Sequence, residues 1–220
     1  MEYHVIKSGS SRSFPGKHAF LSAATKKIKE AGVIVVIGAN TRKHAARLAR
    51  WKHKTAVVLE LGTECLGVHT GESRGEEGSN VVGFARFRLG DAEPTNLVEL
   101  VRQPRTSEAA IAAAKEILEK AGLQVAVCGD FAGRIIDRLV RPYYNAALRR
   151  LDEGLASADD LDTTLKLGLG YPEGPIALLE RTGLAQHCDV TQALFDAMGD
   201  PAYAPARRAR VARQRAGKRK

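Results

Sequence analysis

Long apolar runs are absent from this chain of 220 residues. No stretch reaches the roughly 18 consecutive apolar residues that a membrane-spanning helix requires. Residues 1–5 also lack the basic region and the apolar stretch of a secretory signal. Cysteines are few, and the spacings of Cys65, Cys128 and Cys188 match neither a metal site nor a disulfide framework. We therefore expect a cytoplasmic protein with reduced thiols, without a metal ion and without a membrane partner.

Acidic residues are absent from the basic tail, which we define as residues 204–220. This tail holds eight lysines and arginines, so the rest of the chain carries only +1 of the net charge of +9. A basic segment can bind nucleic acid or a membrane surface. The tail has no aromatic side chain to stack on bases, however, and chain ends are commonly solvated. We predict a frayed terminus and expect no nucleic-acid partner.

Five β-branched runs are separated by polar or helical segments in the first part of the chain. Continuous apolar runs of this kind predict strands that are buried on both faces, as in a parallel sheet. They lie at residues 33–37, 55–59, 81–84, 97–101 and 125–128. Helical patterns at residues 41–51 and 106–122 alternate with them, which predicts an α/β layer of parallel strands. Residues 1–30 are weakly patterned, and we expect a loose lead-in there, with a short helix over residues 23–31.

The apolar spacing changes to a helical period after Gly133. Ile136, Leu139 and Tyr143 lie on one stripe of a long predicted helix, and Ser157 has the form of an N-cap. The second domain is therefore predicted to be all-helical. We expect a lead-in over residues 1–30, a partial α/β domain over 31–127, a helical domain over 128–203 and the basic tail.

Four ordered blocks of this sequence resemble the NAD-dependent 3-hydroxyacyl-CoA dehydrogenases, in particular those of the 3-hydroxybutyryl-CoA type. They lie at residues 97–107, 130–143, 153–162 and 170–175, and the last reads Gly-Tyr-Pro-Glu-Gly-Pro. The resemblance implies a truncated Rossmann-like parallel sheet domain followed by an all-helical, 6-phosphogluconate-dehydrogenase-like C-terminal domain. It also implies NAD as the cofactor, an acyl-CoA substrate and a homodimer through the helical domain.

The glycine turn that binds a dinucleotide is missing from the sequence. Such a turn has the pattern Gly-x-Gly-x-x-Gly after the first strand, so that the backbone can approach the pyrophosphate. The nearest candidate, residues 38–43, has only its first glycine. Residues 1–30 are too short for the strand-helix-strand unit that would complete the family's nucleotide-binding domain. NAD is therefore implied by resemblance alone, unless a partner chain supplies the missing half.

The family's catalytic histidine also has no counterpart in this sequence. The glutamate that orients this histidine matches Glu99, and counting back places the histidine at Phe87, or at Ala85 with a gap. Asp137 stands where the family has an active-site asparagine. Glu99 and Asp137 are thus the candidate catalytic residues. Their structural alternatives are a buried pair with an arginine for Glu99 and a surface salt bridge for Asp137.

Three arginines near the predicted domain junction are candidate substrate-binding residues. Arg134, Arg138 and Arg141 have helical spacing, so we expect them to line one face and to meet the phosphates of CoA. The alternative is that they pair with acids and only solubilise the helix. His69, in a Gly-rich segment, is a further candidate for the missing base, although no partner residue is visible for it.

Two functions remain open from the sequence. The resemblance implies NAD-dependent oxidation of 3-hydroxyacyl-CoA in fatty-acid-type metabolism. The alternative is a non-catalytic dimeric relative that acts as an acyl-CoA-binding or structural module.

Overall fold

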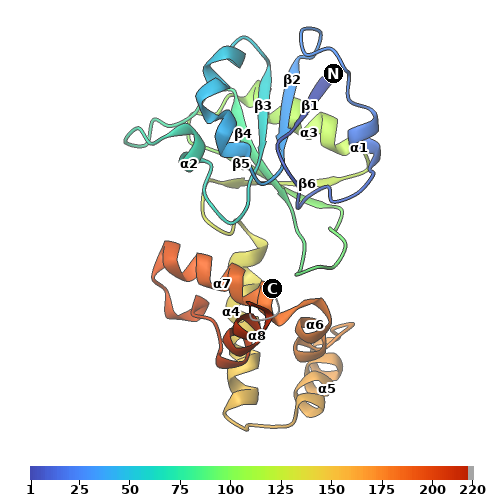
Figure 1. Cartoon of the computed structure of the whole chain (residues 1–220), viewed down its shortest axis with the longest axis vertical. Coiled ribbons are helices and arrows are strands. Elements are labelled where there is room, and N and C mark those ends of the chain that lie inside the picture. Colours follow the sequence, from blue (N-terminus) through green and yellow to red (C-terminus); the bar gives the residue numbers. More distant parts are fainter. Residues whose placement is uncertain (218–220) are drawn as a thin grey trace. The chain divides into compact units, whose positions relative to one another are not determined.

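The computed structural model describes residues 1–217, apart from the side chains of Ala45 and Ala46. Residues 218–220 of the predicted tail lie outside the described residues. The chain forms two compact units (Figure 1). Unit 1 comprises Met1–Arg88 and Pro94–Arg134, and unit 2 comprises Leu89–Glu93 and the chain from Ile135 onward. The division after Arg134 falls later than the predicted boundary after residue 127.

Unit 1 is built on a six-stranded sheet in which the strands follow their order in the chain. The strands are β1 (Tyr3–Lys7), β2 (Val33–Ile37), β3 (Ala56–Glu60), β4 (Val81–Arg86), β5 (Leu97–Arg102) and β6 (Gln124–Gly129). Strands β1 to β4 are parallel, and β5 pairs with β6 in parallel, but β4 and β5 are antiparallel. The predicted Rossmann-like, largely parallel sheet is confirmed. The prediction of parallel strands is wrong for the β4–β5 pair, because residues 87–96 contain no helix and are too few for the crossover of about a dozen or more residues that parallel neighbours need.

The expected loose lead-in over residues 1–30 is wrong, because β1 pairs in register with β2, beginning with Tyr3 opposite Val33. Aromatic packing holds this segment on the sheet. The rings of Tyr3 and Phe20 stack with centroids 4.8 Å apart, and Phe14 stacks on Phe20 at 5.0 Å. The short helix of this segment, α1 (Ala19–Ser22), also lies earlier than the predicted residues 23–31.

Successive side chains of the strands point to opposite faces of the sheet, and both faces are covered. On one face, α3 (Glu108–Glu119) packs over a core that includes Val35 and Val58. The other face is covered by η1, a 3-10 helix (Thr41–Trp51), and α2 (Gly67–Thr70), and its core includes Val36 and Leu59 (Figure 1). Each fully buried side chain of this size contributes about 1.5–3 kcal/mol.

Unit 2 is helical, as predicted. Its elements are α4 (Ile136–Asp152), α5 (Ala158–Leu169), α6 (Pro175–Thr182), α7 (Leu184–Met198), η2 (Pro201–Tyr203) and α8 (Arg207–Gly217). The predicted N-cap is confirmed at Ser157, whose hydroxyl accepts from the backbone N–H of Asp160 at 3.1 Å. No helix among the described residues has the length and apolarity needed to cross a membrane.

The basic tail is folded over its described residues and is not frayed. Ala209 of helix α8 is completely buried against the rest of unit 2. Arg208 donates to Asp152 at 3.1 Å, and Arg213 donates to Asp189 at 2.5 Å. The prediction of a solvated end is wrong because acids on neighbouring helices, which the tail itself lacks, pair with its charges.

Candidate functional site

Glu99 lies on β5 with only 2% of its surface exposed. In the β4–β5 ladder, Ala85 is directly opposite Glu99. Directly opposed residues point to the same face and their Cβ atoms lie about 4.5–5.5 Å apart. Ala85, and not Phe87, is therefore the residue beside the glutamate. A methyl group stands where a proton-accepting ring would be needed.

Arg134 is the charged partner of Glu99. Its Nε lies 3.4 Å from Oε2 of Glu99, and its Nη2 donates to the carbonyl of Gly62 at 2.6 Å. Only 6% of Arg134 is exposed, and its Nη1 has no hydrogen-bond partner within the described part of the chain. A buried donor without an acceptor costs about 1–3 kcal/mol, and more when charged. The predicted alternative, a buried pair of Glu99 with an arginine, thus describes the folded chain.

The backbone at Arg134 is left-handed, with φ of 52°, directly before α4 begins. Arg134 is therefore not on the helix, and the prediction that it shares one helical face with Arg138 and Arg141 is wrong. Arg138 is exposed on α4 and donates to the sulfur of Met198 at 3.1 Å. Arg141 is buried, and its Nε donates to Asp137 at 2.7 Å. The salt bridge expected of Asp137 exists, but it is largely buried.

A histidine that the sequence did not single out completes this buried network in unit 2. Arg141 Nη1 lies 3.0 Å from Nδ1 of His187, and Nε2 of His187 lies 3.0 Å from Oδ1 of Asn145. Because a guanidinium only donates, Nδ1 must accept and Nε2 must carry the proton. Burial, together with the charge of Arg141, lowers the pKa of His187 to about 3. His187 is therefore neutral at physiological pH.

His69 has the partner that the sequence did not reveal. It lies on α2, and its Nε2 is 3.2 Å from Oε1 of Glu64. Nδ1 of His69 is buried and has no hydrogen-bond partner among the described residues. Burial raises the pKa of Glu64, but the hydrogen bonds from His69 and from backbone N–H groups outweigh it and lower the pKa. A carboxylate beside an imidazole is the arrangement that a general base uses.

A third buried carboxylate, Glu60, ends β3 where the loops after β1 and β2 meet. Its Oε1 accepts from the hydroxyl of Ser11 at 2.9 Å and from the backbone N–H of Ser13 at 2.6 Å. Its Oε2 accepts from the backbone N–H of Gly38 at 2.6 Å. A pocket of about 260 Å³ opens beside these loops. The sequence analysis did not single out Glu60; the signal that could have found it is its place directly after the predicted strand 55–59, at the strand ends where open α/β sheets bind ligands.

Comparisons with known proteins match both units. A model of the 3-hydroxyacyl-CoA dehydrogenase C-terminal domain matches residues 133–220. A 3-hydroxybutyryl-CoA dehydrogenase of Bradyrhizobium diazoefficiens is 38% identical over 109 residues, which are 50% of this chain and 37% of that protein. One of Mycobacterium tuberculosis is 36% identical over 149 residues, 67% of this chain and 51% of the relative. Together these matches support a 3-hydroxyacyl-CoA dehydrogenase-like family for this chain.

The solved structures agree with the sequence match. The (S)-3-hydroxybutyryl-CoA dehydrogenase of Ralstonia eutropha superposes with a TM-score of 0.69 at 25% identity, covering 86% of this chain and 67% of that one. This dehydrogenase-like chain spans about a third to a half of the length of the curated relatives named above. The superposition establishes the fold, whereas the activity of a full-length relative does not transfer directly to this chain.

The cofactor that the family resemblance implies does not fit the strand-end corner of this dehydrogenase-like chain. NAD carries a pyrophosphate, which needs backbone N–H groups that are not already bonded. Here the N–H groups of Ser13 and Gly38 are bonded to Glu60. A phosphate at the same place would also meet a like charge at close range, which costs about 1–4 kcal/mol for each pair of unit charges in water or near a protein surface.

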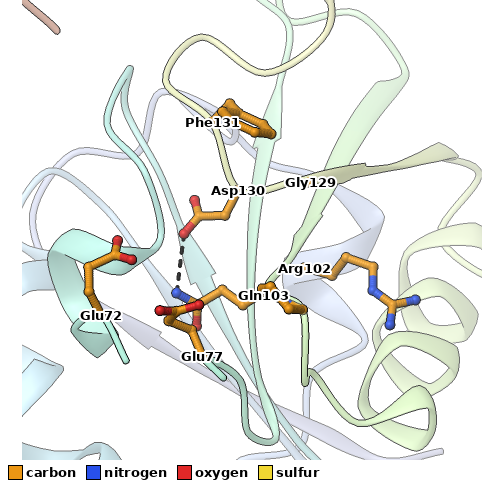
Figure 2. A pocket seen from close by; sticks show the side chains of 8 residues that line it. Glu72, Glu77, Arg102, Gln103, Gly129, Asp130 and Phe131 are labelled. Carbon is orange, nitrogen blue, oxygen red and sulfur yellow. Dashed lines mark hydrogen bonds between the residues drawn. The ribbon is translucent and has the colours of Figure 1, made fainter. Parts of the chain in front are cut away.

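A larger pocket of about 400 Å³ lies at the other edge of the sheet, where β5 and β6 end. Figure 2 shows Glu72, Glu77 and Asp130 around it, with the hydrogen bond from Gln103 to Asp130 at 3.2 Å. Arg102 also lines this pocket but lies 2.7 Å from Glu108. Three carboxylates would repel the phosphates of CoA, so this pocket does not suit the ligand class of the family.

Proposed function

We propose that this chain binds a 3-hydroxyacyl-CoA-type thioester without oxidising it. The observation that carries the proposal is the pair formed by Glu99 and Arg134, with Ala85 opposite the glutamate. The two relatives named above are 3-hydroxybutyryl-CoA dehydrogenases, and the proposed ligand class follows from that likeness.

Binding is supported by the unpartnered Nη1 of Arg134. The 3-oxygen and the thioester carbonyl of such a substrate are hydrogen-bond acceptors, and a buried guanidinium is a strong donor to them. Supplying that acceptor would remove the cost of the unsatisfied donor. We therefore propose Arg134 as a substrate-binding residue. Arg141 is a weaker candidate, because its guanidinium is already bonded to Asp137 and His187.

The same pair argues against oxidation. A guanidinium stays protonated and cannot accept the hydroxyl proton, and Ala85 offers no base. Burial and the charge of Glu99 raise the pKa of Cys128 to about 11, so this nearby thiol is not a base either. Loss of a general base typically costs about 10²–10⁴-fold in rate. Catalytic roles for Glu99 and Asp137, NAD as a cofactor and a cytoplasmic location stay predictions.

We also propose that unit 2 forms the predicted homodimer. Helix α5 buries none of its residues within the chain, although it carries Leu167 and Leu169 at 83% and 62% exposure. Leu139 on α4 is 70% exposed. Exposed large apolar residues in one small unit are typical of a surface that a second copy covers.

The direct test is calorimetric binding of acetoacetyl-CoA and 3-hydroxybutyryl-CoA. We expect saturable binding by the wild type and roughly 10–100-fold weaker binding by Arg134→Met, from the loss of a hydrogen bond to a charged donor. Arg134→Lys keeps the charge beside Glu99 but not the forked donors, and it should also bind weakly. Arg105→Met removes an exposed arginine of the same unit and is the matched control. Equal affinity of wild type and both Arg134 variants would contradict the proposal.

A second candidate function rests on His69 and Glu64. If substrate reaches Nδ1 of His69, this dyad could replace the missing base. Fluorescence titration with NADH, followed by NADH oxidation with acetoacetyl-CoA, separates the candidates. Saturable NADH binding with turnover that disappears in His69→Gln would support catalysis, whereas acyl-CoA binding without NADH binding supports the non-catalytic function.

A further inference from the structure

Glu60 has the surroundings of a bound anion, not those of an ordinary surface acid. Only 5% of the residue is exposed, although it lies at the end of a strand. Two backbone N–H groups and a hydroxyl converge on its two oxygens at 2.6–2.9 Å. Backbone N–H groups from successive loops that point to one centre form an anion-binding concavity.

The two loops that supply these donors are fitted closely to each other. The backbone N–H of Asn40 donates to the carbonyl of Ser8 at 2.9 Å, and that of Ala39 donates to Ser10 at 3.0 Å. Gly38 has φ of 112°, and a Cβ there would lie 2.5 Å from the carbonyl oxygen of Ser8. Only glycine permits this approach, which brings its N–H beside that of the other loop.

We propose that Glu60 is the resident anion of this corner. Its carboxylate occupies the place of a nucleotide phosphate, joins the ends of β1, β2 and β3, and makes the corner independent of a cofactor. Removing the side chain would expose the N–H groups of Ser13 and Gly38 and create a site for a small oxyanion. The inference concerns unit 1 alone and does not depend on acyl-CoA binding.

Chemical rescue tests this inference. The variant is Glu60→Ala, and the probes are sodium formate and inorganic phosphate at about 100 mM, compared with sodium chloride of matched ionic strength. Losing hydrogen bonds to a charged group should lower the melting temperature of Glu60→Ala by roughly 5–10 °C. Formate or phosphate should raise the melting temperature of Glu60→Ala by at least about half of that fall, measured relative to the same variant in chloride. The wild type, whose corner is filled, should show no such anion-specific shift.

Two further variants keep the test decisive. Glu64→Ala removes another carboxylate that lines the same pocket. Glu64 accepts from His69 and not from the N–H groups of Ser13 and Gly38, so formate should not specifically stabilise the Glu64→Ala variant. Glu60→Gln keeps the shape of the side chain, so it should be destabilised but not rescued. It also gives a readout if Glu60→Ala does not fold without an anion.

Amide exchange measured by NMR reports on the same atoms. The N–H groups of Ser13 and Gly38 should exchange slowly in wild type, faster in Glu60→Ala, and slowly again with formate. Formate acting no better than chloride on Glu60→Ala would overturn the proposal. So would wild-type stability in Glu60→Gln, or a specific stabilisation of the wild type by phosphate.

Discussion

Acid should destabilise unit 2 through a single buried histidine. The pKa of His187 is lowered to about 3 from its ordinary value of 6.5 by burial and by the neighbouring Arg141. The folded chain therefore binds this proton more weakly than the unfolded chain does. The stability that a neutral His187 contributes is complete above about pH 6.5 and is lost as the pH falls from there toward 3.

The magnitude follows from the size of the pKa difference. Each pH unit below the unfolded pKa costs about 1.4 kcal/mol while the folded histidine stays neutral. Between about pH 6.5 and pH 5 the loss is thus about 2 kcal/mol, which is a large part of the stability of a small domain. Protonation cannot be accommodated locally, because Nδ1 of His187 faces a guanidinium that only donates.

The two units can be followed with different probes in one urea titration. Trp51 is the only tryptophan of the chain and is buried in unit 1, so its fluorescence reports unit 1. Far-UV circular dichroism is dominated by helix and reports mainly unit 2. We expect the dichroism midpoint to fall between pH 7 and about 5 by more than the fluorescence midpoint does.

A matched pair of variants identifies the titrating group. His187→Gln should be less stable at neutral pH, but its dichroism midpoint should lose most of the dependence on pH. His53→Gln removes an exposed histidine and should follow the wild-type curve. An imidazole of His187 that titrates near pH 6.5 by NMR, or the same pH dependence in His187→Gln as in wild type, would refute the reasoning.

Three other outcomes are expected. Gly90→Ala should destabilise unit 2 by roughly 3 kcal/mol in urea unfolding, because φ is 56° and the new Cβ would lie 1.7 Å from the carbonyl oxygen of Thr182; an unchanged midpoint would contradict this. A chain ending at Ala206 should melt roughly 5 °C or more below one ending at Gly217, because only the first lacks α8 with its buried Ala209 and its ion pairs to Asp152 and Asp189; equal melting temperatures would show that α8 is dispensable for stability. Leu167→Glu should convert the proposed dimer to a monomer in light scattering, whereas Val68→Glu on unit 1 should not; a monomeric wild type at micromolar concentration would disprove the dimer.

The central strands were predictable because each is a continuous β-branched run buried on both faces. Strand β1 was missed for the opposite reason. Three of its five residues are only partly buried and one is exposed, so it has no continuous apolar run. Edge strands of this kind are recognised by their partner, here β2, which lies elsewhere in the sequence. The reversal of β5 was also missed, because the side-chain pattern of a buried strand is the same in either direction.

The candidate site was predictable only in part, because its decisive contacts are non-local. Glu99 was found through its place in a family block, but its partner follows 35 residues later. Arg134 was assigned to a helix by spacing, although the left-handed backbone at Gly133 and Arg134 separates it from α4. Charge pairs between distant segments leave no periodic signal in a sequence.

Two features of unit 1 share one physical logic. Beside Glu99, the chain's own Arg134 supplies the positive charge that a buried carboxylate needs, and at the corner Glu60 supplies the negative charge that converging N–H groups need. A site kept for an external cofactor would leave such groups open until the ligand binds, at a cost in stability. Here both are satisfied within the fold, apart from Nη1 of Arg134. An external acyl-CoA ligand would therefore stabilise unit 1 most by accepting a hydrogen bond from Nη1 of Arg134.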